Sequence, residues 1–281
     1  MKLEVKAELK YIVHSPSTLI LNIHALRTQK QMVLEEALVI EPYIKVEELT
    51  AESQAHRLIR LEFSKEEEIS ISYKAIVDNF YKQTDHTDLM EVEVGQLDAS
   101  VFSYLYPSRY CQSDKLFRFA RSKFGGITNP FLKVLALTDW IHSNVEYLSG
   151  STNAQTSAYD TVTELAGVCR DFAHLGIALC RALTIPARYF TGYAYKLYPQ
   201  DFHACFEAYL GNEWVVFDAT KLVPLNGLVK IATGLDAADS AVASLFGNLD
   251  FKEMMVSCII AEDNFEPFYY ESSQFQGLSY Q

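Results

Sequence analysis

The chain has 281 residues, of which 49% are hydrophobic and 21% charged, with a formal net charge of −12. This balance is that of an ordinary globular protein, and the length allows one large domain or two. The acidic excess argues against nonspecific binding to nucleic acid or to an anionic membrane. No apolar run approaches the roughly 18 residues of a spanning helix, and residues 1–6 alternate charged and apolar side chains, unlike a signal peptide. We therefore expect a cytoplasmic protein with no nucleic-acid or membrane partner.

The first 80 residues show the alternation of half-buried β-strands. From Lys2 to Val13 every second residue is apolar, and similar period-two runs cover residues 19–25 and 69–77. Ser15-Pro16-Ser17 and Glu41-Pro42 separate these runs. Short antiparallel strands with one solvated face predict an N-terminal β-sandwich domain over residues 1–95.

The pattern changes to a helical one beyond residue 95. Ser113-Asp114 is a typical helix start, and Asn129-Pro130 opens a longer stretch with one buried stripe. Residues 170–183 have helical spacing and end at Ile185-Pro186. Residues 188–195, 203–210 and 214–220 are predicted strands. A buried helix beside antiparallel strands predicts an α+β domain over residues 96–281, with a boundary near residues 95–110.

The five cysteines are widely spaced and odd in number, which fits reduced thiols better than a disulfide framework: Cys111, Cys169, Cys180, Cys205 and Cys258. Cys169 follows Ala166-Gly167-Val168 at the expected start of a helix. Free N–H groups and the positive dipole end there favour a thiolate and could bind an oxyanion. The alternative is a small buried hydrophobic residue, which is our assignment for Cys180, about 16 Å further along the helix axis.

A predicted hairpin brings a histidine and an aspartate together. If Gly211-Asn212 forms a two-residue turn, Leu210 pairs with Glu213, and His203 and Asp218 become diagonal neighbours on one face. A carboxylate in that position can hold the imidazole in the tautomer that accepts a thiol proton. Individually, each could be structural: a hydrogen-bonded histidine and a turn aspartate. Together with Cys169 they predict a catalytic triad.

Other candidates fit this chemistry less well. His174 lies about 140° around the helix from Cys169 and cannot be its base. Cys205 shares a strand face with His203 but has no helix start to activate it, so it is a second choice as nucleophile. A zinc site on His203 and Cys205 has no evident further ligands.

Four segments closely resemble the bacterial transglutaminase-like superfamily, whose members are often described as cysteine proteases. These segments are Gly167-Val168-Cys169-Arg170-Asp171-Phe172-Ala173, Ile185–Tyr193, His203-Ala204 with Glu207, and Trp214–Thr220. The N-terminal strands are similar to the β domain that precedes the core in many members. Residues 231–234 and 236–239 are similar to the usual C-terminal extension. Together the likeness covers most of the chain.

The resemblance implies a papain-like α+β core with the triad Cys169, His203 and Asp218. Two positions depart from the family pattern: Cys205 stands where tryptophan is common, and Ala219 replaces a proline. An upstream side chain often supplies a second oxyanion donor, for which Tyr147 and Tyr159 are candidates.

The expected reaction is acyl transfer from a peptide or carboxamide through a thioester, with no metal or organic cofactor. We expect hydrolysis, as in a cysteine peptidase or amidase, because water needs no acceptor site; transamidation is the variant with an amine acceptor. The alternative from another class is a catalytically silent peptide-binding module whose groove is lined by Tyr193, Tyr195 and Trp214.

Overall fold

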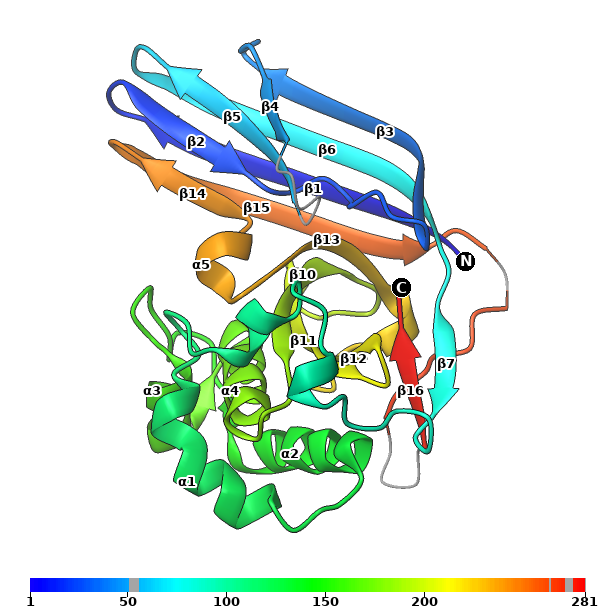
Figure 1. Cartoon of the computed structure of the whole chain (residues 1–281). Coiled ribbons are helices and arrows are strands. Elements are labelled where there is room, and N and C mark those ends of the chain that lie inside the picture. The colour runs from blue at the N-terminus through cyan, green and yellow to red at the C-terminus, as the bar shows by residue number, and fades with distance from the viewer. Residues whose placement is uncertain (51–55, 263, 271–274, 281) are drawn as a thin grey trace.

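Two lobes make up the structure, which is a computed structural model describing residues 1–50, 56–262, 264–270 and 275–280 (Figure 1). A β-sandwich forms one lobe, and a helical layer against an antiparallel sheet forms the other. The expected α+β class with a papain-like core and a β-sandwich is therefore confirmed. No helix in the described ranges is long and apolar enough to cross a membrane.

Long strands with strict alternation build the sandwich. One sheet has the order β15-β1-β6-β3 and the other β14-β2-β5-β4. Their bounds are Lys2–Val13 (β1), Ser17–Leu21 (β2), Gln31–Glu41 (β3), Glu47–Thr50 (β4), Arg57–Phe63 (β5), Glu67–Asn79 (β6), Ala243–Phe246 (β14) and Leu249–Ile260 (β15). In β1 every second residue from Leu3 to Val13 is at most 2% exposed, as the period-two pattern predicts. These side chains meet those of the facing sheet in one apolar core.

Strand pairing crosses the boundary expected near residues 95–110. β14 and β15 come from the C-terminal part of the chain, yet they pair with β2 and β1 of the sandwich. Conversely, β7 (Lys82–Asp85) leaves the sandwich and pairs with β16 (Gln276–Ser279) in the other lobe. Each lobe is thus built from separate segments, because the open edges of β1 and β2 are covered by strands distant in sequence.

The second lobe carries a six-stranded antiparallel sheet of order β13-β10-β11-β12-β16-β7. Its remaining strands are Ala187–Ala194 (β10), His203–Leu210 (β11), Glu213–Phe217 (β12) and Leu228–Gly234 (β13). Helices Ser113–Phe124 (α1), Pro130–Asn144 (α2), Ala158–Glu164 (α3) and Cys169–Ala182 (α4) pack beside it. α4 lies directly against β11: a Cβ at Gly176 would stand 2.4 Å from the ring of Phe206.

The helices and strands that the sequence predicts in this lobe are present with small changes in bounds. Asn129 caps α2 by accepting a hydrogen bond from the Leu132 N–H at 3.0 Å, with a proline following. The strand expected over residues 214–220 was too long: β12 ends at Phe217, and Asp218 begins a turn. Just before α4, the short strand β9 (Ala166–Gly167) pairs in parallel with β8 (Glu146–Tyr147).

Hydrogen bonds between side chains and backbone groups join the two lobes. Gln31 exchanges two hydrogen bonds of 2.7 Å with the backbone of Lys230. The Tyr193 hydroxyl donates to the Ile23 carbonyl oxygen at 2.6 Å. Side chains of β10 and β13 also enter the sandwich core. These contacts hold the two lobes in a fixed relation.

Candidate active site

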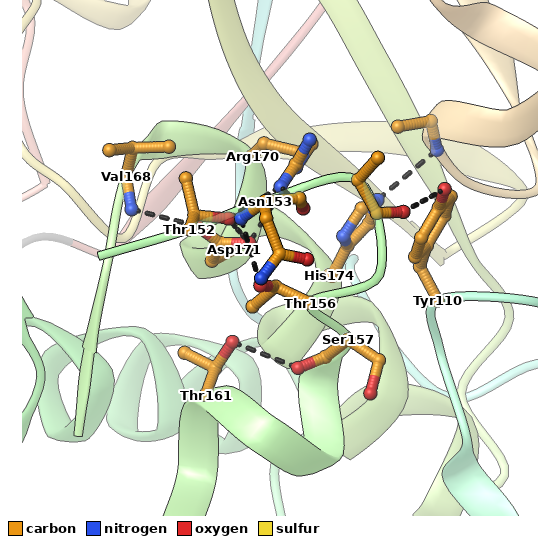
Figure 2. Close-up of polar contacts among 12 residues, drawn as sticks. Tyr110, Thr152, Asn153, Thr156, Ser157, Thr161, Val168, Arg170, Asp171 and His174 are labelled. Atoms are coloured by element: carbon orange, nitrogen blue, oxygen red, sulfur yellow. Dashed lines mark hydrogen bonds and ion pairs between the residues drawn. The ribbon is translucent and has the colours of Figure 1, made fainter. Parts of the chain in front are cut away.

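Cys169 is the first residue of α4, as predicted, and the turn that contains it is tightly held. The Asp171 carboxylate accepts a hydrogen bond of 2.9 Å from the Val168 N–H, which closes the start of the helix (Figure 2). Gly167 permits this, because a Cβ there would stand 2.7 Å from that of Asp171. The Cys169 N–H belongs to the first helical turn and so has no partner within the helix.

A loop preceding α3 is tied to the two residues that follow Cys169. The other oxygen of Asp171 accepts from the Thr152 hydroxyl at 3.1 Å. Arg170 donates through Nη2 to Thr152 and to the Asn153 carbonyl oxygen (Figure 2). Asp171 is fully buried, whereas the bonds from Arg170 reach toward the surface. The start of α4 and the loop therefore form one rigid unit.

The predicted hairpin brings His203 and Asp218 together. Gly211 and Asn212 both have positive φ, at 56° and 65°, which is the geometry of a two-residue hairpin turn. Leu210 pairs with Glu213, so the expected register is confirmed. The His203 Nε2 atom lies 2.9 Å from Asp218 Oδ2.

The surroundings of His203 favour its protonated form. Its side chain is 1% exposed, and burial by itself lowers the pKa of the imidazole. The charge and hydrogen bond of Asp218, followed by the Cys169 side chain, outweigh burial and raise the pKa of His203 to about 10. The other ring nitrogen, Nδ1, has no hydrogen-bond partner among the described residues. It is the ring nitrogen that is not bonded to Asp218.

Cys169 and His203 line the same surface hollow, whose volume is about 890 Å³ including the part open to solvent. Cys169 is partly exposed, whereas the four other cysteines are buried. Burial raises the pKa of each of these four thiols, that of Cys111 to about 12. Cys169 is thus the accessible thiol, and the assignment of Cys180 to the core is confirmed.

Tyr147 and Tyr159, the two candidates for an oxyanion donor, differ in position. Burial raises the pKa of Tyr147; the Cys169 side chain raises it further, whereas a hydrogen bond from the Cys169 backbone acts against this rise. Its hydroxyl group therefore lies beside Cys169. Tyr159 is instead 43% exposed, with the Lys115 ammonium 5.2 Å from its ring centre. The geometry favours Tyr147.

His174 is fully buried, and its Nε2 accepts a hydrogen bond of 3.1 Å from the Ala237 N–H. It is engaged in structure, in agreement with its exclusion as a base. Cys205 is 1% exposed, which leaves it inaccessible as a rival nucleophile. The described residues contain no group of three or more histidine, cysteine, aspartate or glutamate side chains arranged for a metal ion.

Of the three residues expected to line the groove of a binding module, two, Tyr193 and Trp214, do not do so. Tyr193 is fully buried between the lobes. Trp214 is 5% exposed and lies beneath the Arg188 guanidinium, 4.2 Å from its ring centre. Their large apolar surfaces are used in packing, so neither can line an open groove.

Asp171 and Thr152 were missed as residues of the site. An acidic residue three positions after the helix cap is a capping pattern, which could have indicated Asp171. Nothing in the local sequence indicates Thr152, because its contact with Asp171 spans 19 residues.

Comparison with known families matches both lobes. The profile of the bacterial transglutaminase N-terminal domain covers residues 1–100, and that of the transglutaminase-like superfamily covers residues 118–219. A crystal structure from Cytophaga hutchinsonii, described as a "Putative Cysteine Protease", superposes with a TM-score of 0.98 at 57% identity. The superposition covers 100% of this chain and 98% of that one. The chain belongs to the bacterial transglutaminase-like superfamily, a group of cysteine enzymes.

Two curated relatives match over shorter stretches. An uncharacterized protein of Mycobacterium leprae is 31% identical over 121 residues, which are 40% of this chain and 43% of that protein. An uncharacterized protein of Mycobacterium tuberculosis is 40% identical over 65 residues, 23% of this chain and 21% of that protein. The chain thus spans less than half the length of these curated relatives.

Proposed function

We propose that this protein catalyses acyl transfer from a peptide or carboxamide, with Cys169 as nucleophile, His203 as proton carrier and Asp218 as the group that orients His203. The observation that carries the proposal is the shared hollow of Cys169 and His203, with the far side of the imidazole bonded to Asp218 at 2.9 Å. The close likeness to a protein described as a cysteine protease supports the same chemistry.

In the first half of the reaction, the Cys169 sulfur attacks the carbonyl carbon while His203 holds the proton of the thiol. The carbonyl oxygen becomes an oxyanion, which the Cys169 N–H and the Tyr147 hydroxyl can stabilise. His203 then gives its proton to the leaving nitrogen, the C–N bond breaks and a thioester remains. Asp218 stabilises the imidazolium until this proton is given up.

In the second half, water attacks the thioester carbon and gives up a proton to His203. The C–S bond breaks, the acid leaves, and the proton returns to sulfur. We propose hydrolysis, as in a cysteine peptidase or amidase, because Cys169 is open to solvent and water needs no further binding site. Replacing the water by an amine would make the same site a transamidase. These steps use groups of the chain itself, water and a peptide or protein substrate.

Alkylation with iodoacetamide near pH 6, followed by mapping of the modified cysteines by mass spectrometry, tests the assignment. Cys169 should react at least about tenfold faster than the other four cysteines, because only the thiolate is a nucleophile and burial raises the pKa of the others. His203→Ala should slow this labelling. His142→Ala, at an exposed histidine of α2, is the matched control and should leave the rate unchanged.

Uniform labelling of the five cysteines would overturn the proposal. Preferential labelling of Cys205 would assign the nucleophile to a different residue. Labelling of Cys169 that is equally fast in His203→Ala would remove His203 from the mechanism and favour a binding module that retains the fold.

A further inference from the structure

The hollow beside Cys169 has walls of small, uncharged side chains. An acyl group attached to Cys169 must lie in this hollow, because the sulfur is part of its lining. One wall comes from the chain that leads from β13 into the sandwich, together with one residue of the loop before α3. Its side chains are Ala154, Ala237, Ser240, Ala241, Val242 and Ala243. The aromatic residues on the lining are Tyr110, Tyr189 and Phe202.

Hydrogen bonds within the described part of the protein already engage three of the four hydroxyl groups on the lining, those of Thr191, Ser240 and Tyr110 but not that of Tyr189. The Thr191 hydroxyl donates to the Ser240 carbonyl oxygen at 2.9 Å, and the Ser240 hydroxyl donates to the Asp236 carbonyl oxygen at 2.6 Å. The Tyr110 hydroxyl donates to the Ala154 carbonyl oxygen at 2.8 Å (Figure 2). An acyl side chain placed here would therefore meet few free hydrogen-bond donors.

Besides His203, whose charge is paired with Asp218, Arg170 is the one charged side chain on this lining, and its charge is directed elsewhere. Its Nη2 donates to Thr152 and to the Asn153 carbonyl oxygen, and its Nε lies 3.6 Å from the buried Asp171 carboxylate. Arg170 therefore holds the loop that carries Ala154 (Figure 2). Turning toward an anionic substrate would cost these bonds.

The sandwich holds the small-residue wall in place. α5 (Ala237–Ser240) lies between the two lobes and leads into β14 of the sandwich (Figure 1). Ala243 pairs with Leu21 of β2, and the Asn22 N–H donates to the Val242 carbonyl oxygen at 2.8 Å. At the other end, the Ala237 N–H is bonded to His174. Because this wall is anchored at both ends, the same small side chains should still line the hollow when an acyl group is bound.

We infer that the acyl donor carries an uncharged, apolar side chain next to the carbonyl that Cys169 attacks, and that the wall from Ala237 to Ala243 selects it. This inference rests on the proposed function, since it assigns the hollow to a group attached to Cys169. A charged side chain would be moved out of water with no partner of opposite charge free to receive it. The N-terminal lobe thus contributes to specificity through β2, which supports this wall.

The test uses N-acetyl aminoacyl chloromethyl ketones, which alkylate a thiol irreversibly and so need no known substrate. We compare reagents with norleucine, lysine and glutamate side chains, at about 0.3 M salt to screen the net charge of the protein. Rates of Cys169 modification are divided by the rates with 2-mercaptoethanol, which removes differences in intrinsic reactivity. Norleucine should react at least about tenfold faster than either charged reagent.

A charge placed on the wall should change this order. In Ala241→Glu the lysine reagent should gain at least about tenfold relative to norleucine. Ala238→Glu is the matched control, because Ala238 lies in α5 three residues before Ala241, is exposed and is not part of the lining. Its ratio of rates should stay that of the unmodified protein.

The outcomes separate the inference from the proposed function. Equal normalised rates for the three reagents, with iodoacetamide still selective for Cys169, would overturn the inference and leave acyl transfer intact. A faster glutamate reagent would assign Arg170 a role in binding an anionic substrate and would also overturn it. Loss of iodoacetamide selectivity would refute both.

Discussion

Asp218 is fixed on both sides: its Oδ2 atom lies 2.9 Å from His203 Nε2, and its Oδ1 atom accepts two hydrogen bonds from Thr220. The backbone N–H and the hydroxyl of Thr220 supply those bonds, at 2.9 and 2.7 Å. Asp218 therefore ends β12 and orients the imidazole at the same time. The structural and functional interpretations of this residue, which the sequence presents as alternatives, are compatible.

Asp218→Asn should slow acylation of Cys169 by about 100-fold or more, because a carboxamide cannot stabilise the imidazolium in the same way. The measurement is the initial release of p-nitrophenolate from p-nitrophenyl acetate. Asp139→Asn is a matched control, since Asp139 forms an ion pair with Lys221 and is not part of the hollow. Similar rates in the two variants would contradict the role of Asp218.

Tyr147→Phe should reduce acylation by p-nitrophenyl acetate by about 100-fold, the usual effect of losing one oxyanion donor. Its alkylation by iodoacetamide should stay nearly unchanged, because that displacement forms no oxyanion. Tyr159→Phe should affect neither reaction, since its ring lies against Lys115. A parallel loss of both reactions in Tyr147→Phe would indicate that Tyr147 only shapes the site.

Asp171→Ala should lower the free energy of unfolding by about 1–3 kcal/mol, because it leaves the Val168 N–H and the Thr152 hydroxyl without their partner. Urea unfolding measures this change, and alkylation of Cys169 should slow as well. Asp160→Ala removes a similar cap from α3, where Asp160 accepts from Ser157. That control should lose stability while the alkylation rate is retained.

Glu207→Gln should destabilise the protein by about 3–5 kcal/mol, because two buried cations lose their counter-charge. Glu207 is fully buried between Arg188 at 2.6 Å and Lys230 at 2.7 Å. Burial raises the pKa of Glu207, and the two cations lower it by more, so the ionised form is the native one. Glu47→Gln, which breaks an exposed pair on the sandwich, should give no measurable change in urea unfolding.

The stability that His203 contributes should depend on pH in one direction. Its pKa is raised to about 10 in the folded protein, against about 6.5 for an unfolded histidine, so the folded state binds the proton more tightly. The stabilisation is present in full below pH about 6.5 and is lost as the pH rises through about 10. Urea unfolding of the unmodified protein and of His203→Gln should show their difference shrinking by at least about 1 kcal/mol between pH about 6 and pH about 9.5. A difference that grows with pH would show that the pKa is lowered.

Local patterns in the sequence determined much of the site. Helical spacing placed Cys169 at the first residue of α4, and Gly211-Asn212 determined the hairpin register that joins His203 to Asp218. Both results depend on periods of a few residues and on one turn type, which neighbouring residues decide. The same kind of signal identified β1 and β6 and the start of α2.

Only the tertiary structure decided which distant segments meet. It added β14 and β15 to the sandwich, bonded Thr152 to Asp171, and brought the wall from Ala237 to Ala243 beside Cys169. These contacts join segments separated by tens or hundreds of residues, where no local period applies. They form because strand edges and buried polar groups need hydrogen-bond partners, and these partners can come from any part of the chain. The sequence by itself therefore indicated the side chains that we propose to react, whereas the surroundings that would select a substrate depend on long-range packing.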